Sequence, residues 1–227
     1  SLYSEGQAIL LTSSSVIAKG REAAAEELEA AVADIAFADG RFSIVGTDRG
    51  VDILTLAAKH PKALDAAEIA PIDNHTFPNG CHIAEVEIDP ETGQVSVERY
   101  AVADDFGKTV NPLIVRGQVA GGVAQGMGQA LLENTVFDRE SGQLLSGSFM
   151  DYALPRADDL PDIEVELLEV PCRSNPLGVK GAGEAGAVGS PPALVNAVLD
   201  ALQGDGVTQI DMPMTAEKVW RALATAA

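Results

Sequence analysis

A glycine-rich stretch at residues 175–193, NPLGVKGAGEAGAVGSPPA, constrains the fold more than any other part of the chain. Five of the twelve residues from 178 to 189 are glycine, and glycine lets a backbone adopt positive φ or press closely against a neighbour. Ser190 is typical of a helix N-cap and Pro191 of a first helical residue. The stretch therefore predicts a tight glycine loop that presents Glu184, its single acid, just ahead of a helix.

Three interpretations of this loop can be weighed from the residues. The glycines could serve only as turn residues, with Glu184 a solvated acid. A phosphate-binding GxxxxGK[ST] loop is absent, because Gly183 is followed by an acid that would repel phosphates. The GxGxxG pattern at 181–186 does match a dinucleotide loop, but that fold needs a strand directly before it, and VPCRSNPLGVK contains two prolines there.

The charge balance limits the partners of the chain. Lys and Arg number 15 against 34 Asp and Glu, a net charge of −19, which argues against nucleic acid or an anionic membrane as a partner. An apolar run of about 18 residues is missing, as is a signal-peptide pattern. We expect a soluble, cytoplasmic protein.

Cysteine and histidine spacing indicates that no metal is held by protein side chains. Cys81 and Cys172 are alone and form no CxxC pair, so iron–sulfur and zinc sites are not indicated. His60, His75 and His82 do not have the spacing of metal ligands either.

Hydrophobic periodicity predicts an α+β fold with hairpins, mixed sheet and packed helices. Ser15 can cap a helix over 16–32, while a ligand-binding role for residues 12–15 is equally open. The remaining expected elements are a hairpin at 35–38 and 41–45 around Asp39-Gly40, a short helix near 53–59, a long connection over 62–80, a hairpin of 82–89 with 94–103, a turn-linked pair at 137–145, a strand at 163–170 and a helix at 216–226.

The segment RGQVAGGVAQGMGQALLE, which follows the Asn111-Pro112 turn, has apolar residues at four-residue intervals and is predicted to be helical. Four glycines, at 121, 122, 126 and 128, lie within it, and each costs about 1 kcal/mol relative to alanine in a helix. A helix with so many glycines is expected to pack very closely against a neighbour.

GVKGAGEAGAVGSPPA, taken together with GQVAGGVAQGMG, HIAEVEIDPETG and DMPMTAEKVWRAL, resembles the xanthine oxidase family of molybdenum hydroxylases. The likeness is to the C-terminal part of the molybdopterin-binding large subunit, in the branch of bacterial aldehyde oxidoreductases and carbon monoxide dehydrogenase-like proteins. It covers nearly the whole chain, so residues 1–227 are expected to form one C-terminal molybdopterin-binding domain.

The resemblance implies roles for particular residues. The acid of the family's GxKGxGE motif is the catalytic base, which corresponds to Glu184. The cofactor would be contacted by Gln118, Asn111 and the backbone of Lys180, Gly181 and Gly183. The family's serine-rich pterin loop, often GSRS, corresponds to residues 12–15 and hence to Ser13, Ser14 and Ser15; serine replaces its arginine here.

The resemblance also implies cofactor and partners. The cofactor would be molybdopterin with molybdenum, in its cytosine dinucleotide form, shared with the rest of the subunit and without iron–sulfur or FAD in this chain. The partners would be the remaining half of the molybdopterin subunit, iron–sulfur and FAD subunits, and a small-molecule substrate: an aldehyde, an N-heterocycle or carbon monoxide. A different class of function remains open: a non-catalytic assembly domain that lacks cofactor on its own.

Overall fold

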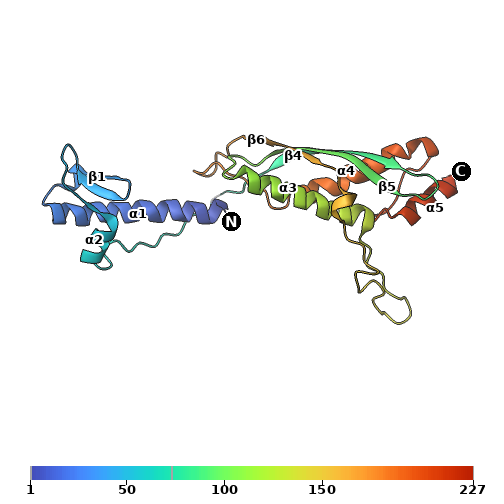
Figure 1. The fold of residues 1–227 in the computed structure, drawn as a ribbon, viewed down its shortest axis with the longest axis horizontal. Coiled ribbons are helices and arrows are strands. Elements are labelled where there is room, and N and C mark those ends of the chain that lie inside the picture. Colours follow the sequence, from blue (N-terminus) through green and yellow to red (C-terminus); the bar gives the residue numbers. More distant parts are fainter. Residues whose placement is uncertain (1, 73, 227) are drawn as a thin grey trace. The chain divides into compact units, whose positions relative to one another are not determined.

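The computed structural model describes residues 2–72 and 74–226 (Figure 1). The chain divides into two compact units: unit 1 is Ser1–His75 with Ser174–Leu177, and unit 2 is Thr76–Arg173 with Gly178–Ala227. Each unit has a hydrophobic core of its own. The expectation from the family resemblance, that residues 1–227 form one C-terminal molybdopterin-binding domain, stays a prediction. Among the described residues no helix combines the length and apolar composition needed to cross a membrane.

Unit 1 packs a long helix against a small antiparallel sheet of order β1-β2-β3. Phe42 and Leu56 are fully buried in its core. The predicted hairpin at Asp39-Gly40 is confirmed, with φ values of 49° and 76° that fit a primed turn. The predicted short helix is confirmed as well. The elements are α1 (Leu2–Leu28), a 3-10 turn (Val32–Asp34), β1 (Ile35–Ala38), β2 (Arg41–Ile44), β3 (Gly50–Asp52) and α2 (Ile53–Lys59).

The prediction that Ser15 caps a helix was wrong, because α1 begins at Leu2 and contains residues 12–15. The serine hydroxyls find partners without ending the helix. Ser14 Oγ donates to the Leu10 carbonyl at 2.9 Å, one turn back, and Ser15 Oγ donates to Glu68 Oε1 at 2.6 Å. Serine bonded in this way can lie inside a helix.

Unit 2 contains a sheet of order β4-β5-β6, in which β4 and β5 are antiparallel and β5 and β6 are parallel. Figure 1 shows α3 and α4 on the same side of this sheet. The second hairpin, the strand after it and the last helix are confirmed. The elements are β4 (Asn79–Ile88), β5 (Val95–Asp105), α3 (Pro112–Met127), a π turn (Gly128–Leu132), β6 (Ile163–Leu168), α4 (Ala185–Ala201) and α5 (Ala216–Ala226), with 3-10 turns at Ala157–Asp159 and Gln203–Asp205. The pair expected at 137–145 is reduced to one bridge between Phe137 and Leu144.

The close neighbour expected for the glycine-rich helix is α4. A Cβ built on Gly122 would lie 2.8 Å from the Ala187 nitrogen, and one on Gly126 would lie 1.8 Å from Ser190 Oγ. A Cβ on Gly186, in α4, would lie 2.3 Å from the Val119 carbonyl oxygen. Glycine on both helices therefore allows the two backbones to touch.

The predicted start of α4 was wrong: the helix begins at Ala185, and Pro191 and Pro192 lie inside it. Its first turn closes before the prolines, where Val188 donates its N–H to the Glu184 carbonyl at 2.9 Å. Proline already has a helical φ, but inside a helix it lacks the N–H donor and its ring crowds the carbonyl four residues earlier. Ser190 is not a cap; it is fully buried, and its Oγ forms no hydrogen bond within the described part of the chain.

Candidate functional site

Residues 178–184, called the glycine loop below, connect the end of the sheet region to α4. Gly178 begins the loop with a φ of 68°, and its carbonyl accepts hydrogen bonds from the N–H groups of Lys108 and Cys172 at 2.8 and 2.9 Å. Val179 pairs with Gly107. The loop ends at Glu184, the N-cap residue of α4.

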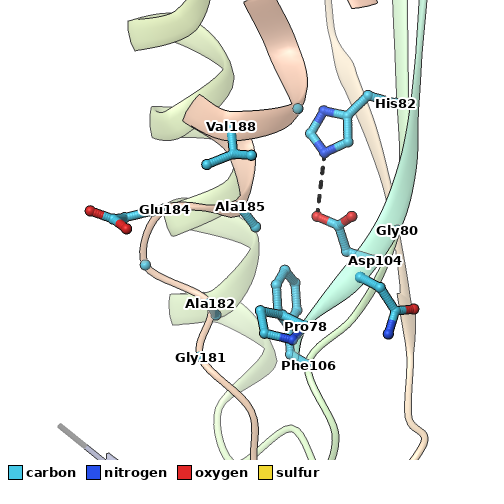
Figure 2. A pocket seen from close by; sticks show the side chains of 13 residues that line it. Pro78, Gly80, His82, Asp104, Phe106, Gly181, Ala182, Glu184, Ala185 and Val188 are labelled. Carbon is cyan, nitrogen blue, oxygen red and sulfur yellow. Dashed lines mark ion pairs between the residues drawn. The ribbon is translucent and has the colours of Figure 1, made fainter. Parts of the chain in front are cut away.

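Glu184 is exposed, and its side chain forms no capping hydrogen bond with α4. Figure 2 shows its carboxylate directed away from His82 and Asp104. It directly precedes the first turn of a 17-residue helix. The sequence expectation of an acid presented ahead of a helix is therefore met, with the helix starting directly after the acid.

A cavity of about 390 Å³ lies beneath the loop, within the size range of small-molecule sites. Residues 181–185 form one wall and Val188 and Gly189 of α4 continue it (Figure 2). The opposite wall comes from β4, β5 and their flanks, and consists of Pro78, Asn79, Gly80, His82, Asp104 and Phe106.

A buried polar cluster forms the sheet side of this cavity. His82 Nδ1 lies 2.9 Å from the Tyr100 hydroxyl, and His82 Nε2 lies 3.5 Å from Asp104 Oδ2. Among the described residues, Asp104 Oδ2 accepts no hydrogen bond, so its contact with His82 is electrostatic. Burial raises the pKa of Asp104 although His82 acts in the opposite direction, and burial together with the Asp104 charge raises the pKa of Tyr100.

His82 and Asp104 were missed as site residues by sequence reasoning, which considered histidines only as possible metal ligands. A signal was present in HIAEVEID. Every second residue from His82 onward lies on the same face of β4. On this face Ala84, Val86 and Ile88 are half-buried, while the residues between them are exposed. A histidine in phase with apolar positions is expected to point inward.

Lys180 forms a buried ion pair with Asp105, with 2.5 Å between Nζ and Oδ2. Burial disfavours the charged form of Asp105, but the hydrogen bonds from Lys180 and from the N–H groups of Gly107 and Val170 outweigh it, so its pKa lies below the usual value. The Lys180 N–H also donates to the Phe106 carbonyl at 2.8 Å. Both polar ends of Lys180 are therefore engaged within the chain.

Asn111 and Gln118 lie at the start and in the middle of α3, and both are exposed. Asn111 is the N-cap of α3, where its Oδ1 accepts the Ile114 N–H at 3.2 Å. Gln118 follows Gly117 and is exposed, whereas Val119 and Val123 of the same helix are buried.

The glycines near these residues divide into two groups. A Cβ on Gly80, Gly122, Gly126, Gly186 or Gly189 would collide with other atoms of the chain. A Cβ on Gly117, Gly121, Gly181 or Gly183 would have no neighbour within 4 Å, and none of these four has positive φ. Among the described residues, neither packing nor backbone conformation accounts for glycine at these four positions, called the open glycines below.

Ser13, Ser14 and Ser15 lie in α1 of unit 1, whereas the other predicted cofactor contacts lie in unit 2. Their assignment to a pterin loop stays a prediction. Among the described residues, no group of three or more His, Cys, Asp or Glu side chains is arranged to hold a metal ion.

Known proteins with similar sequences and structures are molybdenum enzymes. A family model described as the molybdopterin cofactor-binding domain matches residues 1–161. The carbon monoxide dehydrogenase large chain of Hydrogenophaga pseudoflava is 37% identical over 227 residues, 96% of this chain and 28% of that protein. The nicotine 6-hydroxylase large subunit of Paenarthrobacter nicotinovorans is 38% identical over 211 residues, 88% of this chain and 26% of that one.

A similar solved structure is the crystal structure of quinoline 2-oxidoreductase from Pseudomonas putida 86. It has a TM-score of 0.78 and 35% identity over 92% of this chain and 28% of that one. The agreement confirms the predicted α+β fold. The chain spans little more than a quarter of the length of these relatives.

Proposed function

Because this chain belongs to the molybdopterin cofactor-binding domain family, in the molybdenum hydroxylases of the xanthine oxidase type, we propose that it forms one wall of a molybdenum-cofactor site. Within that wall, Glu184 is the general base of a hydroxylation reaction. The enzyme it belongs to oxidises an aldehyde, an N-heterocycle or carbon monoxide with water as the oxygen source.

The observation that carries this proposal is the placement of the four open glycines. In the sequence, Gly181 and Gly183 come just before Glu184, and Gly117 and Gly121 lie on either side of Gln118. Glycine in a helix interior costs about 1 kcal/mol relative to alanine, and no contact among the described residues explains glycine at 117 or 121. A ligand that lies against the main chain gives such a reason, because no Cβ then stands between it and the backbone N–H groups.

The site fits the cofactor chemically. The first N–H groups of α4 have no acceptor inside their own helix and can bind polar or anionic groups. When bound, the cofactor supplies the two-electron oxidation of the substrate carbon. Glu184, exposed at the end of the loop, accepts the proton of the attacking water-derived hydroxyl group. The loop backbone at Gly181 and Gly183 and the Gln118 side chain hold and orient the ligand.

The side chains of two residues implied by the resemblance, Asn111 and Lys180, already have partners within the chain. Asn111 caps α3 and Lys180 pairs with Asp105, so we propose that Lys180 contributes backbone contacts and that Asn111 orients the start of α3. We also propose that the cofactor is in its cytosine dinucleotide form. The partners of the chain are the remaining part of the large subunit and the iron–sulfur and FAD subunits.

Alanine at the open glycines tests this function. Gly121→Ala and Gly183→Ala should leave the chain alone as stable as the wild type, or more stable for the helical position, because a Cβ has room. In the complete enzyme the same changes should lower molybdenum and nucleotide content. Gly204→Ala is the matched control, since a Cβ there also meets nothing within 4 Å. Full cofactor content in Gly121→Ala and Gly183→Ala enzymes would refute the proposed wall.

A further inference from the structure

Asp104 and Asp105 are consecutive residues at the end of β5, and both are buried, at 3% and 4% exposure. Their side chains point to opposite sides of the strand, as successive strand residues do. A buried carboxylate is costly unless it is paired. Each has a different partner: His82 for Asp104 and Lys180 for Asp105.

The Asp105 pair holds the first part of the glycine loop. Lys180 is fixed at its Nζ by Asp105 and at its N–H by the Phe106 carbonyl. Asp105 Oδ1 also accepts the N–H groups of Gly107 at 2.8 Å and Val170 at 3.1 Å. The loop therefore leaves the sheet from a rigid point, immediately before Gly181.

The Asp104 pair reaches the other end of the loop through α4. The His82 ring lies against the backbone of Gly189, where a Cβ would be 2.5 Å from Nε2. Gly80 makes room for the carboxylate in the same way, since a Cβ there would be 1.8 Å from Asp104 Oδ1. The imidazole is hydrogen-bonded to Tyr100 at 2.9 Å and lies 3.5 Å from Asp104 Oδ2, and it forms a support for the beginning of α4.

A neighbouring side of the same helical turns packs on α3, where Gly186 meets Val119 and Ser190 meets Gly126. The start of α4 therefore contacts both α3 and His82. Between this support and Lys180, the loop crosses the cavity of about 390 Å³, and the positions above Gly181 and Gly183 are open. Within the chain, the placement of Glu184 is determined by the two ends of the loop.

We propose that the His82–Asp104 pair positions Glu184 by supporting the start of α4, while the Lys180–Asp105 pair fixes the other end of the loop. His82 and Asp104 are positioning residues: they act through Gly189 and α4. This inference rests on the proposed role of Glu184 as the base. It adds that the base is held in place from the sheet, by side chains that Figure 2 shows on the far side of the cavity from the carboxylate.

His82→Ala in the complete enzyme is the first test, with His75→Ala, at an exposed position in unit 1, as the matched control. Amide hydrogen exchange at residues 184–190 should accelerate, because local opening of the helix start becomes easier. Turnover per bound molybdenum should fall roughly tenfold to a hundredfold, the effect of misplacing a reacting group by about 1 Å. KM and molybdenum content should stay near wild type. The control should change none of these.

Gly189→Ala is a smaller change at the same contact, and it tests the proposal if His82→Ala does not fold. Its added methyl group displaces the imidazole, so turnover should fall although alanine favours a helix. In the double variant His82→Ala/Gly189→Ala the methyl occupies space that the ring has left, and part of the turnover should return. That recovery is not expected of a residue that only stabilises the fold.

Two results would overturn the proposal. The first is wild-type exchange and turnover in His82→Ala. The second is faster exchange with unchanged turnover in His82→Ala, while Glu184→Gln separately inactivates the enzyme. The His82–Asp104 pair would then support α4 without influence on the base. If Glu184→Gln itself retains turnover, the proposed function fails and the positioning role fails with it, whatever the exchange experiment shows.

Discussion

Gly126 and Gly121 lie in the same helix, α3, and form a matched pair for testing how α3 and α4 pack. A Cβ on Gly126 would lie 1.8 Å from Ser190 Oγ and 2.8 Å from Pro191 Cδ. A Cβ on Gly121 would meet nothing within 4 Å. Alanine at 126 therefore requires Ser190 and Pro191 of α4 to shift, whereas alanine at 121 projects into open space.

The expected free-energy changes follow from this difference. Alanine in place of a helical glycine gains about 1 kcal/mol at either position, so that term cancels between the two variants. Overpacking a closely packed site costs about 1–3 kcal/mol. Gly121→Ala should therefore be more stable than the wild type by up to about 1 kcal/mol, and Gly126→Ala less stable than Gly121→Ala by about 1–3 kcal/mol.

Urea unfolding of the chain, followed by far-UV circular dichroism, measures this difference through the transition midpoint at constant slope. Adding Ser190→Ala to Gly126→Ala should recover part of the loss, because Ser190 Oγ is the nearest atom to the new methyl group. A Gly126→Ala variant as stable as Gly121→Ala would show that the helices are not in contact there, and the packing argument would be wrong.

Two further predictions concern the metal and acid stability. The chain purified alone should be folded and contain no molybdenum, since we propose that it supplies one wall of the site; stoichiometric molybdenum by elemental analysis would refute this. The lowered pKa of Asp105 means that its paired carboxylate stabilises the fold at pH values above its unfolded pKa, near 3.8, and that this stability is lost as pH falls through the lower folded pKa. Lys180→Met should therefore reduce stability at neutral pH and lessen the loss of stability on acidification, as measured by urea midpoints against pH. Lys108→Met, at an exposed position, should do neither. Identical pH profiles for Lys180→Met and the wild type would contradict the stabilising role of the ion pair.

Local signals in the sequence predicted much of the fold. The Asp39-Gly40 hairpin, the alternation in HIAEVEID and the helix at residues 216–226 all appear in the structure where they were expected. Each depends on turn chemistry or periodicity within a few residues. The glycine-rich helix was also predictable as a closely packed element, although the identity of its neighbour was not.

Two predicted helix starts were wrong, and the strand pair expected at 137–145 is reduced to one bridge. Ser15 and Ser190 both match an N-cap by residue type, yet both lie inside helices. In α4 the contacts of Gly186 with α3 and of Gly189 with His82 favour an earlier helix start than the serine and prolines suggest. Such contacts join residues that are far apart in sequence, so local propensity cannot reveal them.

The candidate site was predictable in part. Glu184 and its loop follow from the motif, but the pairing of Lys180 with Asp105 and of His82 with Asp104 depends on how β4, β5 and α4 meet. The four open glycines could be separated from the packed ones only after the neighbours of each were known.

Replacing the Glu184 carboxylate tests the proposed base most directly. Glu184→Gln keeps the size and hydrogen-bonding capacity of the side chain and removes its basicity, so turnover per bound molybdenum in the complete enzyme should fall by roughly 10²–10⁴. Cofactor content should remain near wild type, and Glu140→Gln, another exposed acid, should be unaffected. A Glu184→Gln enzyme within about threefold of wild-type turnover, only ~0.65 kcal/mol of barrier, would contradict the central claim.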